Sequence, residues 1–181
     1  MHKKQYMERF IMQDLIAWKN RKDRKPLILL GARQVGKTYI LKEFGQREFE
    51  NVAYINCDNN AMAKDLFASD YNIDRILLTI GAITGVNIEA GKTLIIMDEI
   101  QELHRGLASL KYFCENAREY HVAVAGSLLG LSLHQGESYP VGKVNTLEMY
   151  PMTFEEFLWA RGFKQRMDLL QHGMWDVVKS L

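Results

Sequence analysis

The feature that most constrains this chain is a glycine-rich segment at residues 31–38, Gly-Ala-Arg-Gln-Val-Gly-Lys-Thr, which fits the pattern G-x-x-x-x-G-K-[ST]. It follows an unbroken apolar run at 27–30 and leads into a helical pattern at 37–44, so it joins a buried strand to a helix. Glycines are needed there because backbone N–H groups must wrap closely around a phosphate, in conformations that a Cβ would obstruct. The segment therefore predicts a phosphate-binding loop.

Two residues at the end of this segment carry the chemistry that such a loop needs. The ammonium of Lys37 can reach the β and γ phosphates of a nucleotide, and the hydroxyl of Thr38 can bind Mg²⁺. The N-terminus of the following helix adds the positive end of its dipole. The predicted nucleotide-binding residues are those of the loop and the first helical turn: Gly31, Ala32, Arg33, Gln34, Val35, Gly36, Lys37, Thr38 and Tyr39.

Two neighbouring acids, Asp98 and Glu99, follow a second apolar run at 93–97. In open parallel sheets ligands bind at the carboxyl ends of the strands. Asp98 is placed to hold Mg²⁺ through water, and Glu99 can orient and deprotonate an attacking water. The alternative is a pair of acids in a solvated turn, which the phosphate loop upstream makes the weaker interpretation.

Apolar runs and helical patterns alternate along the chain. Five runs predict strands, at 27–30, 52–55, 93–97, 121–125 and, more weakly, 144–149. Helical patterns lie before, between and after them, at 6–18, 37–44, 61–67, 73–83, 107–120 and in a short piece after Ser127. Strands that alternate with helices imply right-handed crossovers and a parallel sheet covered on both faces. The predicted fold class is a three-layer α/β sandwich with an N-terminal helix.

Ser127 follows the run at 121–125, in Ala-Gly-Ser. A polar side chain at the tip of this strand could sense the γ-phosphate. Ser127 could equally cap a helix that begins at Leu128, and the two interpretations are compatible.

The end of the chain carries a helix signal and then an apolar face. Thr153 precedes Glu156 by three residues, which is typical of a capping box, and Gly162 ends the helix that follows. Residues 165–181 are again helical in pattern, with an apolar face that needs a partner. We expect residues 1–162 to form one core and 163–181 to be the helical start of a truncated C-terminal region.

Composition narrows the class of protein. The chain has 181 residues, 48% hydrophobic and 25% charged, which is typical of a single folded domain. Its formal net charge of +1 argues against a protein that mainly coats nucleic acid. A basic run at 19–25 is interpreted as a solvated junction between helix and strand, with nucleic-acid contact as the alternative.

The two cysteines and the hydropathy indicate the compartment. Cys57 and Cys114 lie in apolar surroundings without metal-ligand spacing, so we expect reduced, buried thiols. No stretch approaches the length of a membrane span, and the N-terminus lacks a signal-peptide pattern. The sequence predicts a cytoplasmic protein with no membrane partner.

Taken together, several segments resemble one family, the AAA-type ATPases of bacteria and archaea in which this core precedes a C-terminal domain of unknown function. The resemblance covers roughly residues 1–162. The segments that carry it are the basic stretch before Pro26, GARQVGKT at 31–38, LIIMDEIQ at 94–101, LKYFCE at 110–115, VAGSLLG at 124–130 and LEMYPMTFEEFL at 147–158.

The resemblance implies a five-stranded sheet in the order 5-1-4-3-2 and ATP with Mg²⁺ as the bound nucleotide. It assigns Lys37 and Thr38 to phosphate and metal, and Asp98 to metal. It assigns Glu99 to catalysis and Ser127 to a sensor role, so the implied catalytic residues are Lys37, Glu99 and Ser127.

Two departures from the family pattern matter. The chain has Gly142-Lys143 where such proteins commonly have Gly-Arg. A lysine is a point charge without the fork of an arginine, so an arginine finger there is not supported. The C-terminal domain is also missing, and we expect this chain to be a fragment that acts with that domain or with a protein partner.

The function that these observations favour is Mg²⁺-dependent ATP binding and hydrolysis that couples nucleotide state to another domain or partner, with a homo-oligomer also possible. One alternative is a small-molecule kinase that shares the phosphate loop. Another is a nucleotide-dependent binding module, associated with nucleic acid or with a toxin or defence system. A GTPase is disfavoured because no Gly stands two residues after Asp98 and no NKxD occurs.

Overall fold

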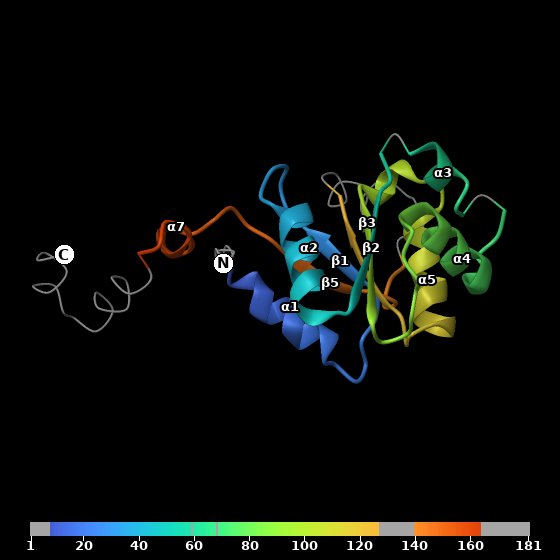
Figure 1. Cartoon of the computed structure of the whole chain (residues 1–181), viewed down its shortest axis with the longest axis horizontal. Coiled ribbons are helices and arrows are strands. Elements are labelled where there is room, and N and C mark those ends of the chain that lie inside the picture. The colour runs from blue at the N-terminus through green and yellow to red at the C-terminus, as the bar shows by residue number, and fades with distance from the viewer. Residues whose placement is uncertain (1–7, 59, 68, 127–139, 164–181) are drawn as a thin grey trace, which may run out of the picture.

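The computed structural model describes residues 8–58, 60–67, 69–126 and 140–163, and within them a five-stranded sheet forms the centre of the fold (Figure 1). All pairings are parallel, and the strand order is β2-β3-β4-β1-β5. This order is the expected 5-1-4-3-2 read from the other edge, so the predicted fold class is confirmed. The strands are β1 (Leu27–Leu30), β2 (Asn51–Asn56), β3 (Thr93–Asp98), β4 (His121–Ala125) and β5 (Asn145–Glu148).

Helices cover both faces of the sheet. In Figure 1, α1 and α2 lie on one side of the sheet, and α3, α4 and α5 lie on the other. α7 follows β5 and lies beyond the sheet, near the N-terminal end of α1. The helices are α1 (Ile11–Lys19), α2 (Lys37–Glu48), α3 (Ala61–Lys64), α4 (Ile73–Thr84), the 3₁₀ helix η1 (Ile100–Glu102), α5 (Gly106–Asn116) and α7 (Phe154–Ala160).

The unbroken apolar strands follow from this layering, because successive side chains of a strand point to opposite faces. In β3, Leu94 and Ile96 belong to the core beneath α1 and α2. Ile95 and Met97 belong to the core beneath α4 and α5. Every residue of β3 is buried, so β3 needs apolar side chains on both faces.

Several helix boundaries differ from the sequence prediction. The described residues 8–10 are not helical, so α1 begins at Ile11 instead of 6. α3 ends at Lys64 instead of 67, because the chain continues from there as a turn.

Two other helices end at different residues from those predicted. α2 continues past residue 44 to Glu48, because Gly45 lets the helix lie against the sheet: a Cβ there would come within 2.6 Å of Val52 Cγ2. α5 ends at Asn116 instead of 120. The chain turns at Ala117, whose carbonyl accepts from Tyr120 N at 3.1 Å, so that it can enter β4.

The N-terminal cap of α7 is as predicted. The Thr153 side chain accepts from Glu156 N, and the Glu156 carboxylate accepts from Thr153 N, so both halves of the capping box are present. The helix predicted after Ser127 and the tail at 165–181 lie outside the described residues.

The basic run at 19–25 makes contacts within the chain. Lys19 forms an ion pair with Glu48, and Arg21 with Asp23. Arg24 and Lys25 donate to backbone carbonyls of Arg118 and Gly142. These contacts favour the interpretation of the run as a junction between helix and strand.

Cys57 and Cys114 are both buried free thiols, as predicted. Over the part of the chain that the structure describes, no helix is long and apolar enough to cross a membrane.

Candidate functional site

The loop between β1 and α2 owes its shape to two glycines with different constraints. A Cβ on Gly31 would come within 2.3 Å of Met149 O, so this position needs the close approach of two backbones. Gly36 has φ 97° and forms the N-cap of α2 in a left-handed conformation, which favours glycine. Residues 32–34 of the loop are exposed, and Val35 is half-buried. The loop therefore presents its backbone at the edge of the sheet where the strands end.

Lys37 is folded back over this loop. Its Nζ donates to Gly31 O and to Ala32 O, each at 2.8 Å, and the residue is only 7% exposed. Burial lowers the pKa of Lys37, while the carboxylates of Glu99 and Asp98 act in the opposite direction. The ammonium is thus held at the centre of the loop, close to both acids, where it can face a bound phosphate.

Thr38 and Asp98 meet directly, although they are 60 positions apart in the sequence. Thr38 Oγ1 donates to Asp98 Oδ2 at 2.5 Å. Asp98 is the last residue of β3 and is 6% exposed. A hydroxyl and a carboxylate are ligands that suit a hard divalent cation such as Mg²⁺. The predicted metal residues are therefore neighbours.

Among the described residues, no group of three or more His, Cys, Asp or Glu side chains could hold a metal ion. A cation beside Thr38 and Asp98 would take its other ligands from water and phosphate oxygens, as Mg²⁺ does in phosphate-transfer sites.

Glu99 stands at a sharp bend of the chain. Its φ of 52° and ψ of 46° place a non-glycine residue in the left-handed region, directly after β3. Backbone of this kind is uncommon and clusters at functional sites. Gln101 Nε2 donates to Glu99 Oε2 at 2.6 Å, so the carboxylate is oriented by its neighbour. Because the chain bends directly after Asp98, both acids can lie near Lys37 although they are adjacent in the sequence.

The sequence analysis missed Tyr54, which lies in β2 next to β3. Tyr54 OH donates to Asp98 Oδ2 at 3.3 Å, the same oxygen that Thr38 contacts. Burial, and then the charge of Asp98, raise the pKa of Tyr54 to about 12, so the hydroxyl keeps its proton. Lys42 Nζ lies 3.3 Å from the centre of the Tyr54 ring. The sequence analysis treated Tyr54 only as part of the apolar run at 52–55. Its contact with Asp98 follows from the strand order, because β2 and β3 are neighbours in the sheet.

Cys57 lies just beyond the end of β2. Burial, and then the charges of Asp98 and Glu99, raise the pKa of Cys57 to about 12. The thiol therefore stays neutral and is not an activated nucleophile.

A second residue missed from the sequence is Arg9, just before α1. Arg9 Nη1 donates to Val35 O in the loop at 3.2 Å. Nothing in the local pattern of the N-terminal segment pointed to this contact, because it joins positions 26 apart across the fold.

Lys143 and two arginines outside the phosphate loop make contacts within the chain. Lys143 Nζ lies 2.8 Å from Glu115 Oε1. Arg105 Nε donates to Tyr71 OH at 3.0 Å, and Arg118 Nε donates to Cys114 O. Ser127, the predicted sensor, lies outside the described residues.

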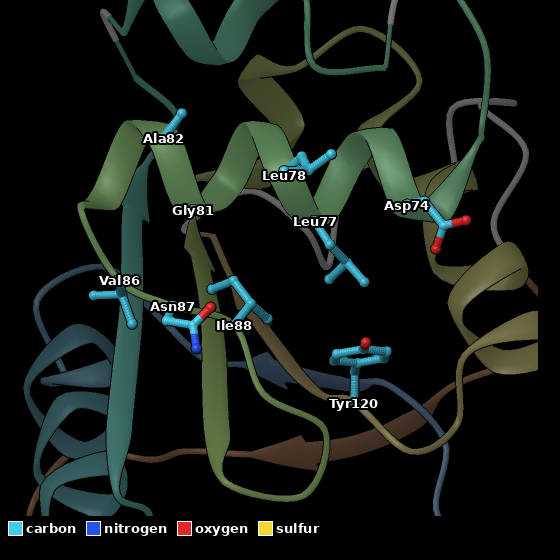
Figure 2. A pocket seen from close by; sticks show the side chains of 9 residues that line it. All are labelled: Asp74, Leu77, Leu78, Gly81, Ala82, Val86, Asn87, Ile88 and Tyr120. Atoms are coloured by element: carbon cyan, nitrogen blue, oxygen red, sulfur yellow. The ribbon is translucent and has the colours of Figure 1, made fainter.

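A separate hollow of about 510 Å³ lies between α4 and the segment that follows it (Figure 2). Figure 2 shows Leu77, Ile88 and Tyr120 around this hollow. None of its lining residues belongs to the loop or to the acid pair. It is mostly apolar and distinct from the candidate site.

A family model described as an AAA domain matches residues 23–158. Among curated proteins, the chain is 31% identical over 145 residues to "Uncharacterized protein MJ1637" of Methanocaldococcus jannaschii. That match covers 76% of this chain and 28% of the relative. The chain therefore spans just over a quarter of the length of this relative.

Several solved structures are similar in fold. The Walker-type ATPase PABY2304 of Pyrococcus abyssi has a TM-score of 0.57 at 19% identity, over 88% of this chain and 59% of that chain. The ORC1 protein of Aeropyrum pernix, solved in complex with DNA, has a TM-score of 0.51 at 15% identity, over 85% and 47%. The RuvB Holliday junction branch migration motor of Thermotoga maritima has a TM-score of 0.51 at 18% identity, over 86% and 49%. At these identities the likeness concerns the fold alone.

Proposed function

Because this chain belongs to the AAA domain family, we propose that it binds ATP with Mg²⁺ at residues 31–39 and hydrolyses it, and that nucleotide state is coupled to a further domain or partner. The observation that supports this most directly is the contact of Thr38 Oγ1 with Asp98 Oδ2 at 2.5 Å. It joins the first turn after the phosphate loop to the acid at the end of β3, which is the arrangement by which P-loop nucleoside triphosphatases hold Mg²⁺.

Each residue of the site has a separate task in this proposal. The loop backbone and Lys37 bind the phosphates, and Thr38 and Asp98 hold Mg²⁺, which when bound neutralises phosphate charge. Glu99 orients the attacking water and accepts its proton. Gln101 holds the Glu99 carboxylate in place through the 2.6 Å hydrogen bond. Ser127 remains a proposed sensor of the γ-phosphate.

The coupling to a further domain is a proposal that the relative's length supports. The matched relative extends well beyond the region shared with this chain. An ATPase core that acts with additional domains would use hydrolysis as a switch. A cytoplasmic location suits the buried free thiols of Cys57 and Cys114.

The first test is the substitution Lys37→Ala, with ATP binding measured by titration calorimetry. It removes the charge that faces the β and γ phosphates, so we expect loss of detectable binding. Lys22→Ala, in the exposed junction before β1, is the matched control and should bind ATP like the wild type. Unchanged affinity in Lys37→Ala would contradict the assignment of the loop.

A second measurement separates hydrolysis from the alternatives. Phosphate release from Mg²⁺-ATP alone is expected of an ATPase. A kinase would release little phosphate without an acceptor, and a binding module would bind ATP with negligible turnover.

A further inference from the structure

The guanidinium of Arg9 joins three segments that are far apart in the sequence. Nη1 donates to Val35 O in the phosphate loop at 3.2 Å, and Nη2 donates to Tyr150 O after β5 at 2.8 Å. Nε lies 3.0 Å from Glu156 Oε1 in the first turn of α7. One side chain therefore contacts the loop, the segment after β5 and α7.

Glu156 does more than close the capping box of α7. Its Oε2 accepts from Thr153 N at 2.8 Å, as a capping box requires. Its Oε1 also accepts from Phe10 N at 2.9 Å and faces Arg9. Burial alone would raise the pKa of Glu156, but the hydrogen bonds from Thr153, Phe10 and Arg9 lower it. The carboxylate is thus kept charged and bound to the N-terminal segment.

Both side chains of this ion pair are almost fully buried, at 6% exposed for Arg9 and 4% for Glu156. In each of the other ion pairs found among the described residues, at least one partner is more than a fifth exposed. A buried ion pair adds little net stability compared with apolar packing, and its better-supported use is to select one arrangement. The arrangement selected here is the position of α7 relative to the phosphate loop.

The surrounding contacts tie α7 to the same place. Met149 N donates to Leu30 O at 2.8 Å just before the loop begins, and Met149 O limits the space at Gly31. The Phe10 ring packs edge-on against Trp159 of α7, with 4.8 Å between the ring centres. A shift of the loop therefore reaches α7 through directly bonded groups.

We propose that Arg9 and Glu156 are positioning residues that transmit the state of the phosphate loop to α7, so that nucleotide binding orders this helix. The inference rests on the proposed binding of ATP at the loop. Movement of Val35 O would shift the guanidinium, and the Glu156 carboxylate would carry that shift into the first turn of α7.

Hydrogen–deuterium exchange of the full 181-residue chain, with and without Mg²⁺ and the non-hydrolysable analogue AMP-PNP, tests this. In the wild type we expect slower exchange at 31–39 and at least about fivefold slower exchange at 157–161, which is the lower end of typical coupling between sites. In Glu156→Gln, which retains an acceptor for the capping box, the loop should still be protected and 157–161 should not respond.

Two further variants make the result specific. Arg9→Lys keeps the charge but cannot reach three acceptors as a fork, so it should lose the response at 157–161 as well. Asp14→Asn removes an exposed carboxylate from the first turn of α1 and should respond like the wild type. If Glu156→Gln or Arg9→Lys were to retain the full response at 157–161, the transmission role would be overturned.

The same experiment distinguishes the two proposals. Wild-type protection at 31–39 without any response at 157–161 would overturn the inference and leave ATP binding intact. No protection at 31–39 in the wild type would overturn the proposed function itself.

Discussion

The carboxylate of Asp98 accepts hydrogen bonds from two hydroxyls, Thr38 Oγ1 and Tyr54 OH, whereas the carboxylate of Glu99 is bound by the amide of Gln101. These different surroundings give two adjacent acids different tasks. Asp98→Asn should weaken Mg²⁺-ATP binding as well as turnover, because it changes a metal-binding oxygen. Glu99→Gln should retain Mg²⁺-ATP and slow hydrolysis by roughly 10²-fold or more, the usual scale for a positioned base.

Calorimetry and steady-state phosphate release measure these two effects separately. Glu102→Gln, an exposed acid in η1, is a control that should change neither. A Glu99→Gln variant that hydrolyses Mg²⁺-ATP at the wild-type rate would remove Glu99 from the proposed catalytic residues.

Tyr54 provides a test of how Asp98 is oriented. Tyr54→Phe removes the hydroxyl that donates to Asp98 Oδ2 and keeps the ring beneath Lys42. Since partners of metal ligands commonly contribute about tenfold or more to metal affinity, we expect the Mg²⁺ requirement for ATP hydrolysis to rise by about tenfold. Titration of activity with Mg²⁺ measures this, and Tyr120→Phe, whose residue lines the separate hollow at α4, should leave it unchanged.

At the level of elements, the contact of α2 with the sheet depends on Gly45. Alanine normally stabilises a helix interior relative to glycine. Here an added Cβ would lie 2.6 Å from Val52 Cγ2 and 3.2 Å from Leu94 Cδ2, and the branched Val52 side chain has little freedom to move. Gly45→Ala should therefore destabilise the protein, by about 1–3 kcal/mol.

Urea unfolding measures this change, and Gln46→Ala, at the exposed neighbouring position, is the control. A more stable Gly45→Ala variant would mean that intrinsic helix preference outweighs the close approach of α2 to the sheet.

The same element shows what the sequence could and could not predict. The runs at 27–30 and 121–125 match β1 and β4 because strands buried on both faces are mostly apolar. The end of α2 was misplaced because Gly45 reads locally as a helix terminator, while its reason lies in Val52 on another element. Local pattern therefore located the elements better than it located their ends.

The residues of the candidate site could likewise be predicted only in part. Lys37 and Thr38 belong to one contiguous motif, and Asp98 ends an apolar strand, so their meeting could be predicted. The contacts of Tyr54 and Arg9 could not be predicted. Tyr54 contacts Asp98 because β2 lies next to β3 in the sheet. Arg9 contacts Val35 O and Tyr150 O, which come from segments far from it in the sequence. Glu156 was predicted only as a helix cap.

For the molecule as a whole, the dependence of stability on pH is set in part by His121, far from the phosphate loop. His121 begins β4, at the opposite end of the strands from Asp98, and packs edge-on against Trp18 and Phe49. Burial, and then the charges of Arg24 and Lys19, lower the pKa of His121 to about 4 from the usual 6.5. The folded protein therefore resists protonation of this ring.

The sign follows from proton uptake: between pH 6.5 and about 4 the unfolded chain binds a proton at His121 that the folded chain does not. Stability should therefore fall as pH drops through this window, by about 3 kcal/mol. The pKa of Glu156 is lowered from 4.5, so its protonation should destabilise the folded protein only at lower pH. Urea midpoints measured across the window should show the slope in the wild type and in His104→Gln, and His121→Phe should lose it. A slope that survives in His121→Phe would assign the dependence to other groups, because this variant keeps an aromatic ring between Trp18 and Phe49 but cannot bind the proton.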